Sequence, residues 1–224
     1  MLLVIIFTLV LMTAFSVYCS ANIRSGYYVQ SVCHLRTDER VMALTFDDGP
    51  DETVTPQILD ILAKYTIKAI FFCIGSKIEG NAELVQRIMN EGHAVGNHSY
   101  SHVATFPLLS LLKMKADILQ CEAAIKKITK SQENSLFRPP FGVTNPVLAK
   151  ALKQLGYTSM GWNVRSFDTT KSAQQVVKRI NSRQNARNII LLHDTTKAMT
   201  EILPQIIDSA LKNGYRFVRA DKYI

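Results

Sequence analysis

Residues 41–50 read Val-Met-Ala-Leu-Thr-Phe-Asp-Asp-Gly-Pro, an apolar run that stops at two carboxylates and a turn. A short apolar run bounded by turn residues is typical of a buried β-strand. Further short apolar runs follow it, and segments with the period of amphipathic helices separate them. This alternation predicts an α/β fold in which parallel strands are joined by right-handed helical crossovers.

The expected elements are seven strands and six helices. The strands span residues 41–46, 68–74, 93–96, 136–138, 157–164, 188–192 and 216–219. The helices span residues 54–65, 81–90, 108–128, 146–155, 173–180 and 200–212. An open doubly wound sheet and a closed barrel both fit this order, and we expect the barrel because closure hides both edges of the sheet.

Polar side chains gather just after the expected strands, at their carboxyl ends. They are Asp47, Asp48, Arg138, Asp168, His98, His102 and His193. In parallel α/β folds, ligands bind and catalysis occurs at that end of the sheet or barrel. The sequence therefore predicts a functional site there, although Asp47 and Asp48 taken alone also fit an ordinary turn.

His98 and His102 are four residues apart in His-Ser-Tyr-Ser-His. If this segment is helical, both imidazoles lie on one face, within reach of one ion; two unrelated loop histidines are the alternative. Two histidines and one carboxylate leave positions open for water and substrate, as in a catalytic zinc site. His193 is either a general acid or a core histidine, and we interpret His93 as structural.

The first 23 residues carry no charged side chain, and Leu2 to Tyr18 are almost wholly apolar. This run is just long enough to span a bilayer. A core helix would normally show a polar face, which this segment lacks. A secretory signal usually has a basic first region and a cleavage site with small residues, and neither is evident here. We therefore favour a membrane anchor over a cleaved signal, followed by a connector, residues 24–40, and an extracytoplasmic catalytic domain, residues 41–224.

The charge and cysteine content narrow the choice of partners. A net charge of +8 favours an anionic partner, such as a cell-wall polymer or a lipid surface, unless it is simply a solvated surface. The basic residues are scattered, which argues against nucleic acid. The four cysteines form no Cys-x-x-Cys pair, so a cysteine-based zinc site is not indicated. The oligomeric state is left open.

Four ordered motifs resemble those of the polysaccharide deacetylase family, also called the NodB-homology or carbohydrate esterase 4 family. They are Thr45–Pro50, His98–His102, Arg138–Gly142 and Leu191–His193. The resemblance covers about residues 41–222 and implies a distorted seven-stranded (β/α) barrel. It also implies metal-dependent removal of acetyl groups from an N-acetylated polysaccharide such as peptidoglycan. A catalytically impaired sugar-binding module and an O-acetyl esterase acting on xylan are the alternatives.

The resemblance also implies roles for individual residues. One divalent metal ion, expected to be zinc with cobalt, nickel or manganese as alternatives, would be held by Asp48, His98 and His102. Asp47 would be the general base, oriented by Arg138, and His193 would protonate the leaving amine. The backbone N–H of Phe141 would help to hold the oxyanion. The substrate side would be lined by Phe141, Arg165 and Trp162.

One segment departs from the family pattern. The family usually carries two Asp residues near a Trp, whereas Arg165 stands at the first of these positions and Asp168 at the second. The usual carboxylate partner of Arg138 and His193 is therefore absent or moved. We hypothesise that Asp168 supplies part of the missing contact and that Arg165 pairs with it or points at the substrate. We also expect Arg165 to lower the pKa of His193, since a positive neighbour disfavours the protonated imidazole.

Overall fold

The computed structural model describes residues 1–129 and 135–224. The described residues form one parallel sheet in the order β5-β4-β3-β2-β1-β7-β6, with β8 pairing β1 outside this path. The strands are β1 (Val41–Asp47), β2 (Ile70–Cys73), β3 (Ala94–Asn97), β4 (Leu136–Phe137), β5 (Thr158–Ser159), β6 (Val164–Arg165), β7 (Asn188–His193) and β8 (Arg216–Phe217).

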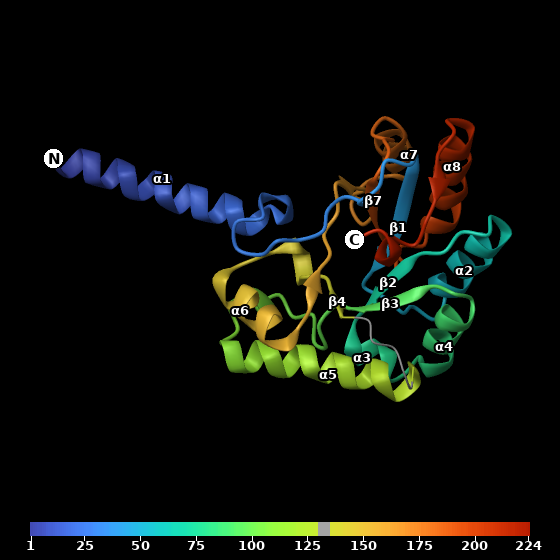
Figure 1. Cartoon of the computed structure of the whole chain (residues 1–224), viewed down its shortest axis with the longest axis horizontal. Coiled ribbons are helices and arrows are strands. Elements are labelled where there is room, and N and C mark those ends of the chain that lie inside the picture. The colour runs from blue at the N-terminus through green and yellow to red at the C-terminus, as the bar shows by residue number, and fades with distance from the viewer. Residues whose placement is uncertain (130–134) are drawn as a thin grey trace.

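Helices cover the outside of this sheet, and the first helix extends away from it (Figure 1). They are α1 (Leu2–Ala21), α2 (Val54–Lys64), α3 (Gly75–Ile78), α4 (Ala82–Asn90), α5 (Leu111–Thr129), α6 (Pro146–Leu155), α7 (Ala173–Asn181) and α8 (Met199–Lys212). Short 3₁₀ turns cover Ile23–Ser25, Phe106–Leu108, Pro140–Gly142 and Ala220–Lys222. Neighbouring helices pack in the series α7, α8, α2, α4, α5, α6. The α/β half-barrel confirms the fold class expected from the sequence.

The expected strand over residues 157–164 is the main difference from the sequence prediction. Its two ends form β5 and β6, which pair with β4 and β7 at opposite edges of the sheet. Residues 160–163 therefore connect the two edges of the sheet. The opening between the edges is crossed by this segment of backbone, and β5 and β6 do not pair with each other by hydrogen bonds. The connector covers this opening, since Val32 bridges Met160 and His34 bridges Asn188.

Strand β1 lies in the middle of the sheet and is buried along its whole length. Its alternate side chains enter two different cores, as expected for a strand covered on both faces. Val41 and Ala43 face the inside of the half-barrel, whereas Met42 and Leu44 pack with the helices. The register with β7 places Asp47 directly beside His193. The parallel sheet thus brings residues far apart in the sequence to one end.

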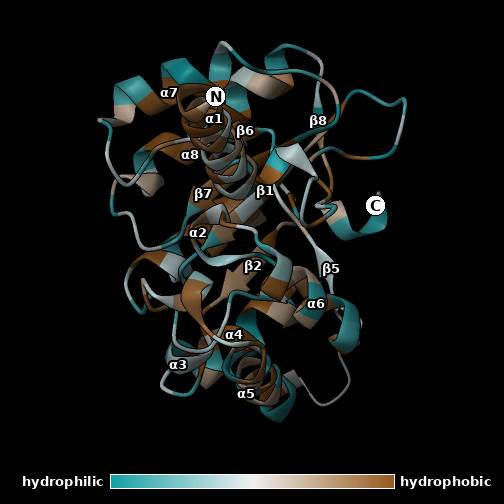
Figure 2. Cartoon of the chain, turned by 90° about the vertical axis from the view of Figure 1, so that its left-hand side faces the viewer, coloured by the Kyte–Doolittle hydropathy of each residue, from teal (hydrophilic) through white to brown (hydrophobic). Residues whose placement is uncertain are grey.

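Helix α1 extends away from the rest of the molecule (Figure 1), and Figure 2 looks along it from its free end. Within the described residues it is the one helix long and apolar enough to cross a membrane. Almost all of its side chains are exposed, which rules out a core helix. Its last turn is fastened to the domain: Ser20 accepts the Thr144 N–H through its carbonyl and donates its hydroxyl to the Thr144 carbonyl.

Candidate metal centre and active site

Asp48, His98 and His102 converge at the carboxyl ends of β1 and β3. Their potential ligand atoms all lie within 4.8 Å of one another. Oδ1 of Asp48 is 3.4 Å from Nε2 of each imidazole. Nδ1 of His98 is 2.8 Å from the carbonyl of Arg138, and an N–H donated there leaves the Nε2 lone pair facing Asp48. Nε2 of His102 is buried and has no hydrogen-bond partner among the described residues.

The loop that carries both histidines is not a helix, so the helical condition considered for the sequence is not met. Ser99 and His102 have left-handed backbones, with φ of 67° and 46°. The loop is held by side chains instead: Asp117 accepts the N–H groups of Tyr100 and Ser101, and the Ser99 hydroxyl accepts that of His102. These contacts, rather than a helical turn, bring the two imidazole rings to 4.7 Å.

The electrostatics of this cluster follow from burial and from the other histidines. Burial alone would raise the pKa of Asp48, but hydrogen bonding and charge from His98, followed by the charges of His102 and His193, outweigh burial and lower it. Burial, followed by the charge of His98, lowers the pKa of His102 to about 4. The cluster therefore holds an anionic carboxylate next to a neutral imidazole at neutral pH, which is the protonation state that metal ligation requires.

Arg138 is fully buried and orients Asp47. One of its guanidinium nitrogens donates to Oδ1 of Asp47 at 2.6 Å and to the Thr45 hydroxyl at 2.8 Å. Its remaining donors reach the carbonyls of Met160 and Gly161. Burial lowers the pKa of Arg138, and the neighbouring Asp47 carboxylate opposes that effect. The guanidinium of Arg138 thus finds protein oxygens as hydrogen-bond acceptors although Arg165 replaces the carboxylate usual in the family.

Asp168 contacts His193, as hypothesised from the sequence. Its Oδ1 lies 2.8 Å from Nδ1 of His193, and its Oδ2 accepts the backbone N–H of the same residue. Burial would lower the pKa of His193, but the hydrogen bond and charge of Asp168 raise it to about 8, with smaller contributions from Asp47 and Asp48. The imidazole Nε2 faces the metal cluster, 3.9 Å from Oδ2 of Asp48.

The pKa of His193 is raised rather than lowered, and the influences on it are burial, Asp168, Asp47 and Asp48, without the expected contribution of Arg165. Arg165 makes no ion pair with Asp168 in the part of the chain described. Its exposed guanidinium lies over the rings of Trp162, 5.9 Å from the centroid, and Phe167, 5.0 Å from the centroid. These aromatic faces attract the cation, so Arg165 is held by the rings rather than by a carboxylate among the described residues.

Phe141 and Trp162 lie on the remaining side of the site. Phe141 has φ of 61°, its backbone N–H donates to no acceptor among the described residues, and its ring lies 4.8 Å from that of His102. Trp162 is buried, and its indole leaves no room for a side chain at Gly142. The sequence-predicted residues are therefore assembled around one point, with Arg165 alone turned toward the neighbouring aromatic rings.

Comparison with known proteins agrees with the family resemblance seen in the sequence motifs. The family described as polysaccharide deacetylase matches residues 34–160, more than half of the chain. The chain belongs to the polysaccharide deacetylase family.

Named relatives extend this likeness over most of the deacetylase chain. A peptidoglycan-N-acetylglucosamine deacetylase of Bacillus cereus is 35% identical over 84% of this chain and 89% of the relative. The peptidoglycan-N-acetylmuramic acid deacetylase PdaA of Bacillus subtilis is 32% identical over 83% of this chain and 72% of the relative. A solved peptidoglycan N-acetylglucosamine deacetylase in complex with 4-naphthalen-1-yl-N-oxidanyl-benzamide is 28% identical, with a TM-score of 0.81, over 87% of this chain and 92% of that one.

Two residues of the deacetylase site were missed by sequence reasoning. Thr45 donates its hydroxyl to the Ile190 carbonyl and accepts from Arg138, but a threonine within a strand gives no signal of this. Asp194 is fully buried, and its carboxylate accepts the Thr55 hydroxyl and occupies the space that a side chain at Gly49 would need. Burial raises the pKa of Asp194 to about 7. Its position directly after His193 was the available signal.

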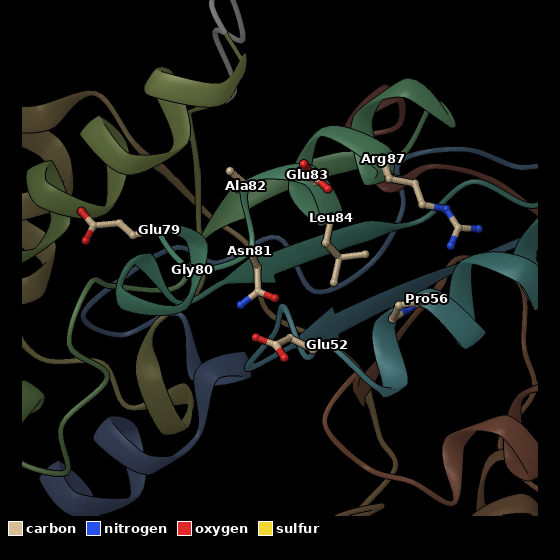
Figure 3. A pocket seen from close by; sticks show the side chains of 9 residues that line it. All are labelled: Glu52, Pro56, Glu79, Gly80, Asn81, Ala82, Glu83, Leu84 and Arg87. Carbon is tan, nitrogen blue, oxygen red and sulfur yellow. The ribbon is translucent and has the colours of Figure 1, made fainter.

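A groove of about 700 Å³ lies where the start of α2 meets α4 and the turn before it (Figure 3). It is lined by Glu52, Pro56, Glu79–Leu84 and Arg87. Tyr100, which lies between the two metal-motif histidines, donates its hydroxyl to Glu79 at 3.4 Å. The groove offers carboxylates and an amide along its length.

Proposed function

We propose that this deacetylase removes the acetyl group from an N-acetylhexosamine of peptidoglycan, using one divalent ion held by Asp48, His98 and His102. The convergence of these three side chains carries the proposal. The orphaned Nε2 of His102 supports it, since a buried polar atom without a partner costs free energy that a metal bond would offset. One carboxylate and two imidazoles suit zinc and leave positions open for substrate.

A divalent ion at this position would supply Lewis acidity, which makes water more acidic and a carbonyl more electrophilic. Asp47 is the base in this proposal. Its Oδ1 is held by Arg138, while its Oδ2 accepts no hydrogen bond from the described residues and can take a proton from water. The free N–H of Phe141 would stabilise the negative oxygen that forms on the acetyl group.

His193 is the acid in this proposal. Asp168 fixes its Nδ1, so Nε2 presents its proton toward the metal cluster. With a pKa of about 8, the imidazole is largely protonated at neutral pH. An amine leaves a tetrahedral carbon readily only when it is protonated, and Nε2 is placed to donate that proton. The intact acid and base argue against an impaired sugar-binding module.

Two relatives that act on different sugars of peptidoglycan support the polymer rather than one sugar. We propose that the groove lined by Glu52 and residues 79–84 binds neighbouring sugar units, because its carboxylates and amide can form hydrogen bonds with hydroxyls. We propose that α1 is retained as an anchor and that the catalytic domain lies outside the cytoplasm, where this polymer is found. A mature N-terminus near Ala21 would contradict the anchor.

The test uses the full chain purified in detergent, with peptidoglycan, chitooligosaccharides and acetyl-xylan as substrates. Released acetate and new free amines are measured together with metal content. Asp47→Asn should keep the metal and lose roughly 10²–10⁴-fold in turnover, since only the proton acceptor is removed. His98→Ala should lose the metal, whereas the exposed His34→Ala is the matched control. Acetate released from acetyl-xylan alone would favour the esterase, and full activity without metal would overturn the proposal.

A further inference from the structure

The chain folds back on α1 just after the helix ends. Tyr27 packs edge-on against Phe15 with ring centroids 5.3 Å apart, and Tyr28 packs edge-on against Tyr27 at 4.9 Å. The Tyr28 hydroxyl is 2.8 Å from that of Ser16. Tyr18 lies on the same stretch of helix, and more than half of its surface is exposed. We call Phe15, Tyr18, Tyr27 and Tyr28 the aromatic collar.

The aromatic collar lies where an apolar helix passes into a polar domain. Tyr18 and Tyr27 are about 60% exposed, although each ring has apolar faces that water solvates poorly. Tyrosine is enriched at the boundary between hydrocarbon and water, where its ring and its hydroxyl meet different surroundings. These rings have no role in the proposed catalysis, whereas at a membrane interface the apolar ring would contact hydrocarbon and the hydroxyl would contact water.

A basic hollow of about 600 Å³ adjoins the collar, lined by residues 30–36 and Arg187. Partial burial lowers the pKa of His34, and the positive charges of Arg24 and Arg187 lower it further, so these groups lie near one another. Arg36 also lines the hollow. Within the described residues, none of the three guanidinium groups pairs with a carboxylate. The hollow thus offers uncompensated positive charge, which an anionic partner would complement.

The collar and the hollow belong to one fixed unit. The side chain of Gln30, in the hollow, donates to the Gly26 carbonyl, next to Tyr27 in the collar. Ile23 is buried against Cys33 and Gly161, and Ser20 is bonded to Thr144. The root of the helix therefore moves with the catalytic domain rather than as a loose tether. A membrane that holds α1 would also meet the collar and the hollow.

We propose that this face docks on the membrane surface, with the aromatic collar in the headgroup layer and the basic hollow on the phosphates of anionic lipids. The inference rests on the proposed retention of α1. Continuity with an apolar helix and charge complementarity both point to a bilayer as the occupant. The docked domain would act on polymer close to the membrane instead of sampling the depth of the wall.

The test places a spin label in the hollow of the full-length protein, reconstituted into vesicles. The label is attached at His34→Cys, because His34 lines the hollow and is exposed, and all four native cysteines are buried. Vesicles contain phosphatidylcholine alone or mixed with phosphatidylglycerol. The probed variant replaces Arg24, Arg36 and Arg187 by Gln. Its control replaces Lys64, Lys127 and Lys212, exposed residues on α2, α5 and α8, by Gln.

Anionic vesicles should protect the label from a water-soluble relaxation agent, and the arginine variant should lose that protection while the lysine control keeps it. Each basic residue near an anionic surface favours docking by roughly fivefold, so three should shift the docked ratio by about a hundredfold. Equal accessibility in both vesicle types would overturn the inference, as would equal protection by inorganic phosphate or a soluble anionic polymer. Because the readout is independent of turnover, a failed deacetylase assay would leave the docking result standing.

Discussion

Asp168→Asn is the change that isolates the acid of the proposed mechanism. It keeps the shape of the side chain but removes the negative charge 2.8 Å from Nδ1 of His193. The Ser166 hydroxyl and the backbone N–H of His193 also donate to this carboxylate, so it is held firmly in place. Because the hydrogen bond and charge of Asp168 are the main favourable influences on the imidazolium, the variant should lower the pKa of His193.

The magnitude follows from the position of that pKa. With a pKa of about 8, roughly three quarters of the His193 imidazole is protonated at about pH 7.5. At the ordinary value of about 6.5, roughly one tenth is protonated. Turnover at that pH should therefore fall about eightfold from protonation alone, with further loss because the ring is less well oriented. The alkaline limb of the pH–rate profile should shift to lower pH by about 1.5 pH units.

The assay combines a pH–rate series with an imidazole NMR titration of His193 in metal-free protein. Asp208→Asn, which removes an exposed carboxylate bonded to Tyr65, is the matched control and should leave both curves unchanged. An Asp168→Asn enzyme with the wild-type alkaline limb and the wild-type His193 titration would refute the reasoning. In that case, some other group would set the charge of the imidazole.

Three further predictions concern the buried polar groups. Arg138→Met leaves the buried Asp47 carboxylate unpaired and should cost about 3–5 kcal/mol in denaturant unfolding, so a loss below about 1 would contradict the role given to Arg138. The pKa of Asp194 is about 7 in the folded state and about 3.8 in the unfolded state, so the free energy of unfolding falls as the pH rises between these values. Asp194→Asn should abolish this fall, which amounts to roughly 4 kcal/mol at most, when unfolding is measured at several pH values. Gly49→Ala puts a Cβ 2.0 Å from the Asp194 carboxylate and should weaken metal binding at least about tenfold in a metal titration, whereas Gly80→Ala, with open space around it, should not.

The sequence predicted the strands best where burial is continuous. The apolar run at residues 41–46 predicted a strand that the structure extends by one residue, and the predicted helix over residues 146–155 has the same bounds as α6. The segment 157–164 was predicted as one strand, but the structure has two short strands there, with residues 160–163 between them. Its ends pair with different strands, and pairing partners depend on tertiary register, which a single segment does not encode.

Some features of the candidate site could be predicted from the sequence, and others could not. Residues such as Asp48 and His98 could be predicted because strand ends share one edge of a parallel sheet. The loop geometry from His98 to His102 could not, since it depends on the distant Asp117. Nor could the pairing of Arg138 with Thr45, because hydrogen bonds across a barrel follow from how strands are packed rather than from local pattern.

The bridges from the connector to Met160 and Asn188 have a consequence for synthesis of the chain. Residues 32–34 leave the ribosome well before their partners, which come from the last third of the sequence. At about 5–20 residues per second, the connector would wait roughly 6–30 s for them. During that interval Cys33 and Leu35, both buried in the finished protein, have no cover from the sheet. A bound chaperone, or the bilayer itself, would have to shield this segment until the half-barrel closes over it.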